Sequence, residues 1–135
     1  MTVTISRQAI ETILADARNH AGREACGLLF GGRDRIEAAS PAKNVAADPA
    51  ATFEIDPQRL FAAIRAERAG GPVIAGHYHS HPAGDFRPSP RDAAAADPDG
   101  RLWLIVGQGG WSLWRAVARG AHLGRFDPVV AVQED

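Results

Sequence analysis

The sequence contains very little cysteine and no long hydrophobic run. Cys26 is the only cysteine in 135 residues, so neither an internal disulfide nor a four-cysteine zinc site can form. The longest aliphatic and aromatic run covers residues 102–106, whereas a bilayer-spanning helix needs roughly 20 apolar residues. The N-terminus also lacks an apolar signal core behind a basic start. These absences predict a cytoplasmic protein that stays in a reducing compartment and does not enter a membrane.

Neither sign of charge dominates the composition. Lys and Arg number 15 and Asp and Glu number 16, which gives a net charge of -1, and Lys43 is the sole lysine. Because no basic stripe is visible, nucleic acid is not an expected partner. Hydrophobic residues make up 45% of the chain and charged residues 23%, an ordinary globular balance. The length predicts a single domain over residues 1–135, while the oligomeric state stays open.

Hydrophobic periodicity predicts interleaved helices and strands. Three helices are expected, each with a cap or proline signal at its start: 6–19, one that begins at 56–57 and stops before 70, and a short one from 89 to before 98. Strands are expected at 25–30, 35–39, 53–55, 73–79, 101–106, 111–117 and, as an edge strand, 129–132. Residues 101–106 are continuously apolar, which indicates a central strand. The predicted class is therefore α/β or α+β, with helices packed on a sheet.

Three of the five histidines occupy alternate positions of one predicted strand: His77, His79 and His81. Side chains at positions i and i+2 share one face of a strand with Cα atoms about 6.6 Å apart, so two imidazoles can reach one ion. Asp92 follows across a loop rich in proline and glycine, and a chain that turns back there brings its carboxylate over the strand end. Two histidines, one carboxylate and an open fourth position are typical of catalytic zinc.

A catalytic metal site also needs a group that moves protons. The group must accept a proton from the attacking water and deliver it to the leaving nitrogen, and a carboxylate beside the metal is the usual solution. The candidates are Glu24, Glu54 and Asp85.

These residues resemble the JAMM signature of the MPN-domain zinc metalloproteases. Glu24-Ala-Cys-Gly-Leu-Leu is followed by His79-Ser-His81-Pro, six further residues and Ser89-Pro-Arg-Asp92, which matches every defining position of that pattern. The resemblance covers most of the chain. It implies a single-domain α-β-α sandwich of the cytidine-deaminase-like kind, with a mixed sheet flanked by helices.

The resemblance also implies the roles of the site residues. His79, His81 and Asp92 match the ligands of one zinc ion, Glu24 matches the general acid/base, and Ser89 matches the residue that stabilises the tetrahedral oxyanion. Members of the family cut amide or isopeptide bonds next to the C-terminal Gly-Gly of ubiquitin-like proteins, and compact bacterial members act on sulfur carriers of that fold. The short chain leaves little room for the insertions of eukaryotic deubiquitinating members, so a small carrier protein is the expected substrate. The leaving group stays open among cysteine, a peptide and a lysine side chain.

Several of these residues also have structural interpretations. The segment from Ser89 to Asp92 resembles a helix capping box, which is compatible with metal binding because a carboxylate has two oxygens. His77 is expected to pack beside the ligands rather than to be one, and Cys26 is expected to be a small buried residue. The three tryptophans are expected in the core or on a sheet face: Trp103, Trp111 and Trp114.

Two other functions compete with hydrolysis. Some relatives use the same fold as a non-catalytic scaffold, but those typically lack the motif residues that are present here. A nucleotide deaminase of the related fold is disfavoured, because zinc deaminases use a P-C-x-x-C ligand pair and this chain has one cysteine.

Overall fold

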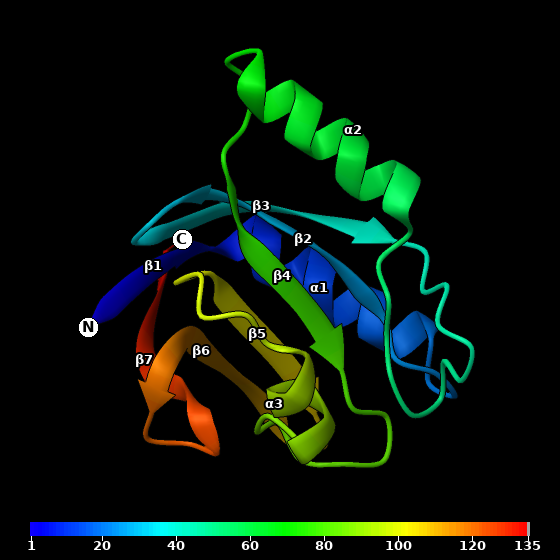
Figure 1. The fold of residues 1–135 in the computed structure, drawn as a ribbon. Coiled ribbons are helices and arrows are strands. Elements are labelled where there is room, and N and C mark those ends of the chain that lie inside the picture. The colour runs from blue at the N-terminus through cyan, green and yellow to red at the C-terminus, as the bar shows by residue number, and fades with distance from the viewer. Residues whose placement is uncertain (135) are drawn as a thin grey trace.

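The computed structural model describes residues 1–134, which form three helices and seven strands (Figure 1). The helices are α1 (Arg7–Asn19), α2 (Pro57–Arg68) and α3 (Pro90–Ala95). The strands are β1 (Thr2–Ser6), β2 (Cys26–Gly32), β3 (Arg35–Ala42), β4 (Ile74–Ser80), β5 (Leu102–Gly107), β6 (Gly110–Gly120) and β7 (Gly124–Glu134). None of the helices in this range is long and apolar enough to cross a membrane.

The strands form one mixed sheet that closes on itself. Their order is β1-β3-β2-β4-β5-β6-β7, and β1 also pairs with β7. Three pairings are parallel: β1 with β3, β1 with β7, and β4 with β5. The other four are antiparallel. The predicted central strand lies between β4 and β6 as β5, and all but its last residue are buried.

Helices cover both faces of this sheet. In β2, Leu29 belongs to the hydrophobic cluster that contains α1, whereas the adjacent Leu28 belongs to the cluster that contains α2. In β5, Leu104 packs in the α1 cluster, and its neighbour Trp103 packs in the cluster of α3. Because adjacent strand residues point to opposite faces, α1 lies on one face and α2 and α3 lie on the other. The predicted arrangement of a mixed sheet between helices is confirmed.

The capping signals in the sequence mark the helix starts correctly. Ser6 caps α1 by accepting a hydrogen bond from the Ala9 amide, and Asp56 caps α2 with Pro57 in the first turn. Ser89 caps α3, followed by Pro90. The predicted helices are therefore found within a residue or two of their expected bounds.

One strand prediction is wrong, and another is right about the strand but wrong about its place at the sheet edge. Residues 53–55 do not form a strand, because only Ile55 makes an isolated bridge to Asn44 and no neighbouring strand continues the ladder. Residues 129–132 are not an edge strand but part of β7, which is much longer and is paired with β6 and β1. β1 itself was not predicted, because only Val3 and Ile5 in that short segment are apolar.

Candidate metal centre

Two paired strands bring Glu24 and the histidines together. β2 runs antiparallel to β4 with Cys26 opposite His79, so Glu24, just before β2, lies beside His81, just after β4. The backbones of Ala25 and Ser80 hold this junction closed: the Ser80 amide donates to the Ala25 carbonyl at 3.0 Å, and the Ala25 amide donates to Ser80 Oγ at 2.8 Å. The position of Glu24 relative to the histidines therefore follows from sheet register.

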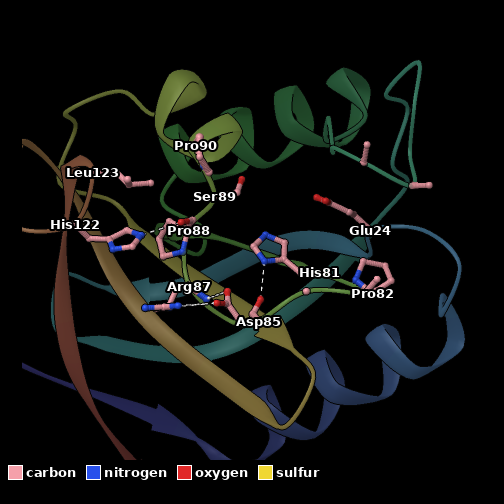
Figure 2. Close-up of a pocket in the computed structure, with 14 residues that line it drawn as sticks. Glu24, His81, Pro82, Asp85, Arg87, Pro88, Ser89, Pro90, His122 and Leu123 are labelled. Carbon is pink, nitrogen blue, oxygen red and sulfur yellow. Dashed lines mark hydrogen bonds and ion pairs between the residues drawn. The ribbon is translucent and has the colours of Figure 1, made fainter.

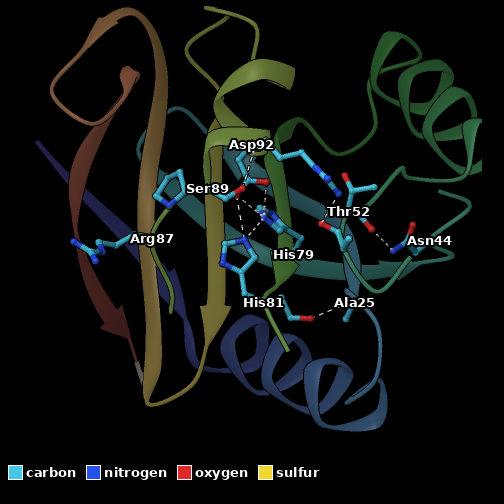
Figure 3. Close-up of polar contacts among 12 residues, drawn as sticks. Ala25, Asn44, Thr52, His79, His81, Arg87, Ser89 and Asp92 are labelled. Atoms are coloured by element: carbon cyan, nitrogen blue, oxygen red, sulfur yellow. Dashed lines mark hydrogen bonds and ion pairs between the residues drawn. The ribbon is translucent and has the colours of Figure 1, made fainter. Parts of the chain in front are cut away.

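Three potential ligand atoms form a nearly equilateral triangle (Figure 3). The Nε2 atoms of His79 and His81 are 3.1 Å apart, and Asp92 Oδ2 lies 3.2 Å from the first and 3.1 Å from the second. Ligands placed about 2.0–2.1 Å from a tetrahedral zinc ion are separated by about 3.3 Å. The triangle therefore has the dimensions of three corners of a zinc tetrahedron, and its fourth corner is free of protein ligands among the residues described.

Hydrogen bonding around His81 supports a cation at this point. His81 Nδ1 lies 2.8 Å from the carbonyl oxygen of Asp85, which can only accept, so Nδ1 carries the proton. In the neutral ring, Nε2 then directs a lone pair toward His79 and Asp92. Converging lone pairs and a carboxylate oxygen repel one another unless a positive ion lies between them.

The charge states favour metal binding as well. Burial lowers the pKa of His79, so its ring is neutral at ordinary pH and can act as a ligand. Burial works against ionisation of Asp92, but its contacts with the two histidine rings and with the Ser89 amide hold the pKa of its carboxyl well below the usual range. A neutral imidazole beside an ionised carboxylate is the state in which both bind a divalent cation.

Asp92 takes part in helix capping and in the triangle at once. Its Oδ2 accepts a hydrogen bond from the Ser89 amide at 2.9 Å, and its own amide donates to Ser89 Oγ at 3.0 Å. This capping box orients the carboxylate toward the histidines. The two interpretations of this segment therefore describe one arrangement rather than alternatives.

Glu24 carries a buried carboxylate without a hydrogen-bond partner on Oε1. Only 6% of the residue is exposed. The pKa of Glu24 is raised to about 7, mainly by burial; Asp92 acts in the same direction, and His81 and Arg91 oppose the rise. A carboxylate that titrates near neutral pH can both accept and return a proton under physiological conditions.

A cavity of about 550 Å³ opens over these residues (Figure 2). Glu24, His81 and Ser89 line it, while the loop residues 82–90 form much of its wall. Leu123 and His122 from the turn between β6 and β7 close one side, and the His122 ring is hydrogen-bonded to the Pro88 carbonyl at 2.8 Å. All five residues singled out by the signature thus lie in or directly beneath one open cavity.

Other candidates are excluded from the triangle. His77 packs against Trp103, with ring centroids 4.3 Å apart, and does not join the three ligands, as expected for a packing residue. The carboxylate of Asp85 is held by Arg87, and Glu54 is exposed. Cys26 is fully buried, which raises the pKa of its thiol to about 12 and makes it a poor nucleophile.

Two residues that support the site carry no signal in the sequence. The Asn44 side chain donates to the Glu24 carbonyl at 2.9 Å and to the Thr52 carbonyl at 3.0 Å, so it fixes both Glu24 and the loop of residues 44–54. Phe53 from the same loop stacks on the His79 ring with centroids 4.3 Å apart. A lone asparagine in a polar loop has no spacing pattern, so only the fold identifies it.

Comparison with known proteins agrees with the site. A family described as prokaryotic homologs of the JAB domain matches residues 6–117. A desampylase of Haloferax volcanii is 35% identical over 114 residues, covering 80% of this chain and 82% of the relative. A probable TtuB-protein conjugate cleaving protease of Thermus thermophilus is 33% identical over 96 residues, which is 71% of this chain and 64% of that protein.

Solved structures show the same fold. A Desulfitobacterium hafniense protein solved in solution aligns with a TM-score of 0.81 and 30% identity, over 100% of this chain and 94% of that one. A JAB1/MPN domain protein from Archaeoglobus fulgidus aligns with a TM-score of 0.61 and 21% identity, over 97% and 98% of the two chains. With its α+β fold and its His-His-Asp triangle, this chain belongs to the prokaryotic JAB/MPN (JAMM) domain family.

Proposed function

We propose that this protein is a cytoplasmic zinc-dependent metallopeptidase. Its substrate is a small ubiquitin-like sulfur-carrier protein, and it hydrolyses the amide bond after the carrier's C-terminal Gly-Gly. The observation that carries this proposal is the triangle of His79, His81 and Asp92 beside the unpartnered, buried Glu24. The relatives named for desampylation and for conjugate cleavage support the class of substrate.

One zinc ion per chain fits the three ligands by distance and by donor type. When bound there, zinc supplies Lewis-acid chemistry, which lowers the pKa of water to about 7 and polarises a carbonyl.

Glu24 moves the protons of the reaction. Its carboxylate takes a proton from the attacking water, whose oxygen bonds to the scissile carbonyl carbon, and then gives that proton to the nitrogen as the C–N bond breaks. The products are the carrier's C-terminal carboxyl group, which keeps the second water proton until it ionises, and a free amine. In the metal-free protein the pKa of Glu24 is about 7, mainly because of burial, so the fold alone brings this carboxyl close to the neutral range in which a general acid/base works well.

Ser89 stabilises the oxygen that becomes negative during attack. Its Oγ accepts a hydrogen bond from the Asp92 amide, so the Ser89 hydroxyl can still donate a hydrogen bond of its own. The same hydrogen bond fixes the hydroxyl at the edge of the cavity, where Glu24 and His81 also lie. A donor held in place before the reaction contributes more than one that must reorient.

The test is cleavage of the host's own ubiquitin-like carriers, each extended beyond Gly-Gly by cysteine, by a peptide or by a lysine-linked protein. Intact mass is measured with and without a chelator, and zinc is counted per chain. Chelator-sensitive loss of one extension supports the proposal and identifies the leaving group. No cleavage of any of them by protein that holds one zinc would contradict it and favour a non-catalytic MPN-type binding module.

A further inference from the structure

A second cavity adjoins the first at the metal ligands. It measures about 240 Å³, and the two residues that it shares with the larger cavity are His81 and Pro82. Figure 2 shows these two residues between the catalytic residues and α1. The apolar wall of this second cavity comes from α1, from the turn that follows α1 and from β5: Leu14, Ala17, Ala21 and Val106. An apolar hollow therefore lies directly beside His81, one of the three candidate metal ligands.

One cation lines this hollow, and two more line a neighbouring one. Arg18 lies on its rim, while Arg23 and Lys43 line a smaller hollow that shares Glu24 with the main cavity. All three side chains belong to exposed residues, and none makes an ion pair within residues 1–134.

Two acids near these cations are already engaged by other groups. Asp16 accepts a hydrogen bond from the Tyr78 hydroxyl at 2.7 Å and pairs with His20 at 3.1 Å. Asp56 accepts from the Gln58 amide at the start of α2. Arg18, Arg23 and Lys43 are therefore exposed and make no ion pair within residues 1–134.

The main cavity offers no comparable charge. Arg87 is the arginine on its wall, and that guanidinium is bound to Asp85 at 3.0 Å. Its remaining wall residues are mostly small or apolar: Ala50, Ala51, Pro82, Ala83, Gly84, Pro88, Pro90 and Leu123. Such a wall suits the passage of an extended tail. Exposed cations without ion pairs, such as those near the end of α1, are the groups that can attract an acidic partner.

We propose that the α1-end surface, defined as Leu14, Ala17, Arg18, Ala21, Arg23 and Lys43, docks the folded body of the protein substrate. The matching face is an apolar side chain surrounded by Asp and Glu residues. The apolar side chain enters the hollow and the acids pair with the cations, which places the carrier's tail across His81 into the main cavity. This inference rests on the proposed function, because it assigns the partner of the same site.

The test compares protein and peptide substrates in charge-reversed variants. Arg23→Glu combined with Lys43→Glu is assayed on the extended carriers and on a short peptide that contains only Gly-Gly and the leaving group. The control reverses Arg65 and Arg68, two exposed cations of α2 that line neither cavity. Unchanged melting temperatures establish that all variants are folded.

We expect the double reversal to raise KM for the carrier about tenfold or more, with kcat and peptide cleavage within twofold of the wild type. The control leaves all these values unchanged. Ala21→Trp, which fills the apolar hollow, raises the carrier's KM without affecting the peptide. In the wild type, KM for the carrier rises with salt, and this dependence weakens after charge reversal.

If the variant with both Arg23→Glu and Lys43→Glu has the same KM for the carrier as the wild type, the proposed docking surface is wrong, even if catalysis is normal. Calorimetric binding of the same carriers to the Glu24→Gln protein separates this failure from failure of the proposed function. Carrier binding that the double reversal weakens, without any turnover by the wild type, supports the surface and contradicts the peptidase. Absence of carrier binding contradicts the surface.

Discussion

At Glu24, a short stretch of backbone determines the environment of one carboxylate. The amide of this residue donates to the Pro49 carbonyl at 2.7 Å and its carbonyl accepts from Asn44, so the side chain is held inside the protein. Replacing Glu24 by Gln keeps this shape but removes the proton-accepting group. We expect kcat to fall by about 10²–10⁴-fold while zinc content stays at one per chain.

The matched control is Glu54→Gln, because Glu54 is an exposed carboxylate of the neighbouring loop. It should retain wild-type activity. Near-normal turnover in the Glu24 variant, measured by intact mass of the carrier, would remove Glu24 from the mechanism.

The raised pKa of Glu24 has a consequence for stability in the metal-free protein. In the folded state this carboxyl holds its proton up to about pH 7, whereas its ordinary pKa is 4.5, so the folded state binds more protons between these values. Stability from this group is therefore complete below pH 4.5 and is lost as pH rises through 7. Relative to Glu24→Gln, the wild type should lose on the order of 1–3 kcal/mol between pH 5 and pH 8.

Urea unfolding of both proteins in chelator at the two pH values measures this difference. A gap between the two proteins that is the same at pH 5 and pH 8 would show that burial does not penalise the Glu24 charge.

Sequence spacing located the residues that bear the proposed chemistry but not those that hold them. His79, His81 and Asp92 have fixed spacing because strand and helix geometry determine which side chains can converge. Asn44 and Phe53 reach the site through a loop whose path depends on tertiary contacts. Their contribution could be recognised only after the loop had been placed against β2 and β4.

At the level of elements, the loop of residues 44–54 depends on one side chain. Asn44 donates to carbonyls of the loop and of Glu24, and its Oδ1 accepts from the amides of Ala46 and Glu54. Asn44→Ala leaves these buried groups unpaired, so we expect a loss of about 2–4 kcal/mol in unfolding free energy and a lower kcat with zinc retained.

Asn19→Ala is the appropriate comparison, since Asn19 is exposed at the end of α1. It should change stability by less than about 0.5 kcal/mol. Equal stability and activity in the two variants would contradict the role assigned to Asn44.

Elements with local signals were predicted well, and elements defined by distant pairing were not. The N-cap residues of all three helices are visible in the sequence, because a cap acts within three residues of itself. The extent of β7 depends instead on β6 and β1. Alternation is interrupted in β7 by Asp127 and Pro128, so the sequence pattern identified only its later part.

For the whole molecule, metal binding should increase stability because only the folded chain brings the three ligands together. His79 lies near the end of β4 and His81 directly after that strand, whereas Asp92 lies in α3. The unfolded chain therefore does not hold these three side chains in a triangle. At zinc concentrations of a hundred times Kd, binding to the folded state alone adds about 2.7 kcal/mol. We expect the melting temperature to rise by roughly 5–15 °C.

Calorimetry of the apo and zinc-loaded protein measures this shift, and a chelator should reverse it. Asp92→Ala serves as the control because it removes one ligand, and it should show little response to zinc. An equal rise in that variant would indicate that zinc binds elsewhere.

The closure of the sheet by β1 and β7 also bears on how the chain folds during synthesis. Thr2 pairs with Val130 and Ser6 with Glu134, so the earliest strand has its longest pairing with the latest one. Contacts between such distant segments form slowly, because the chain loses conformational entropy on bringing them together before the contacts contribute any stabilisation. On a ribosome that adds about 5–20 residues per second, β1 spends several seconds without that partner. The residues of the metal triangle and of the cavity wall, up to Leu123, precede β7 in the chain, so all of them are synthesised before the strand that closes the sheet on β1.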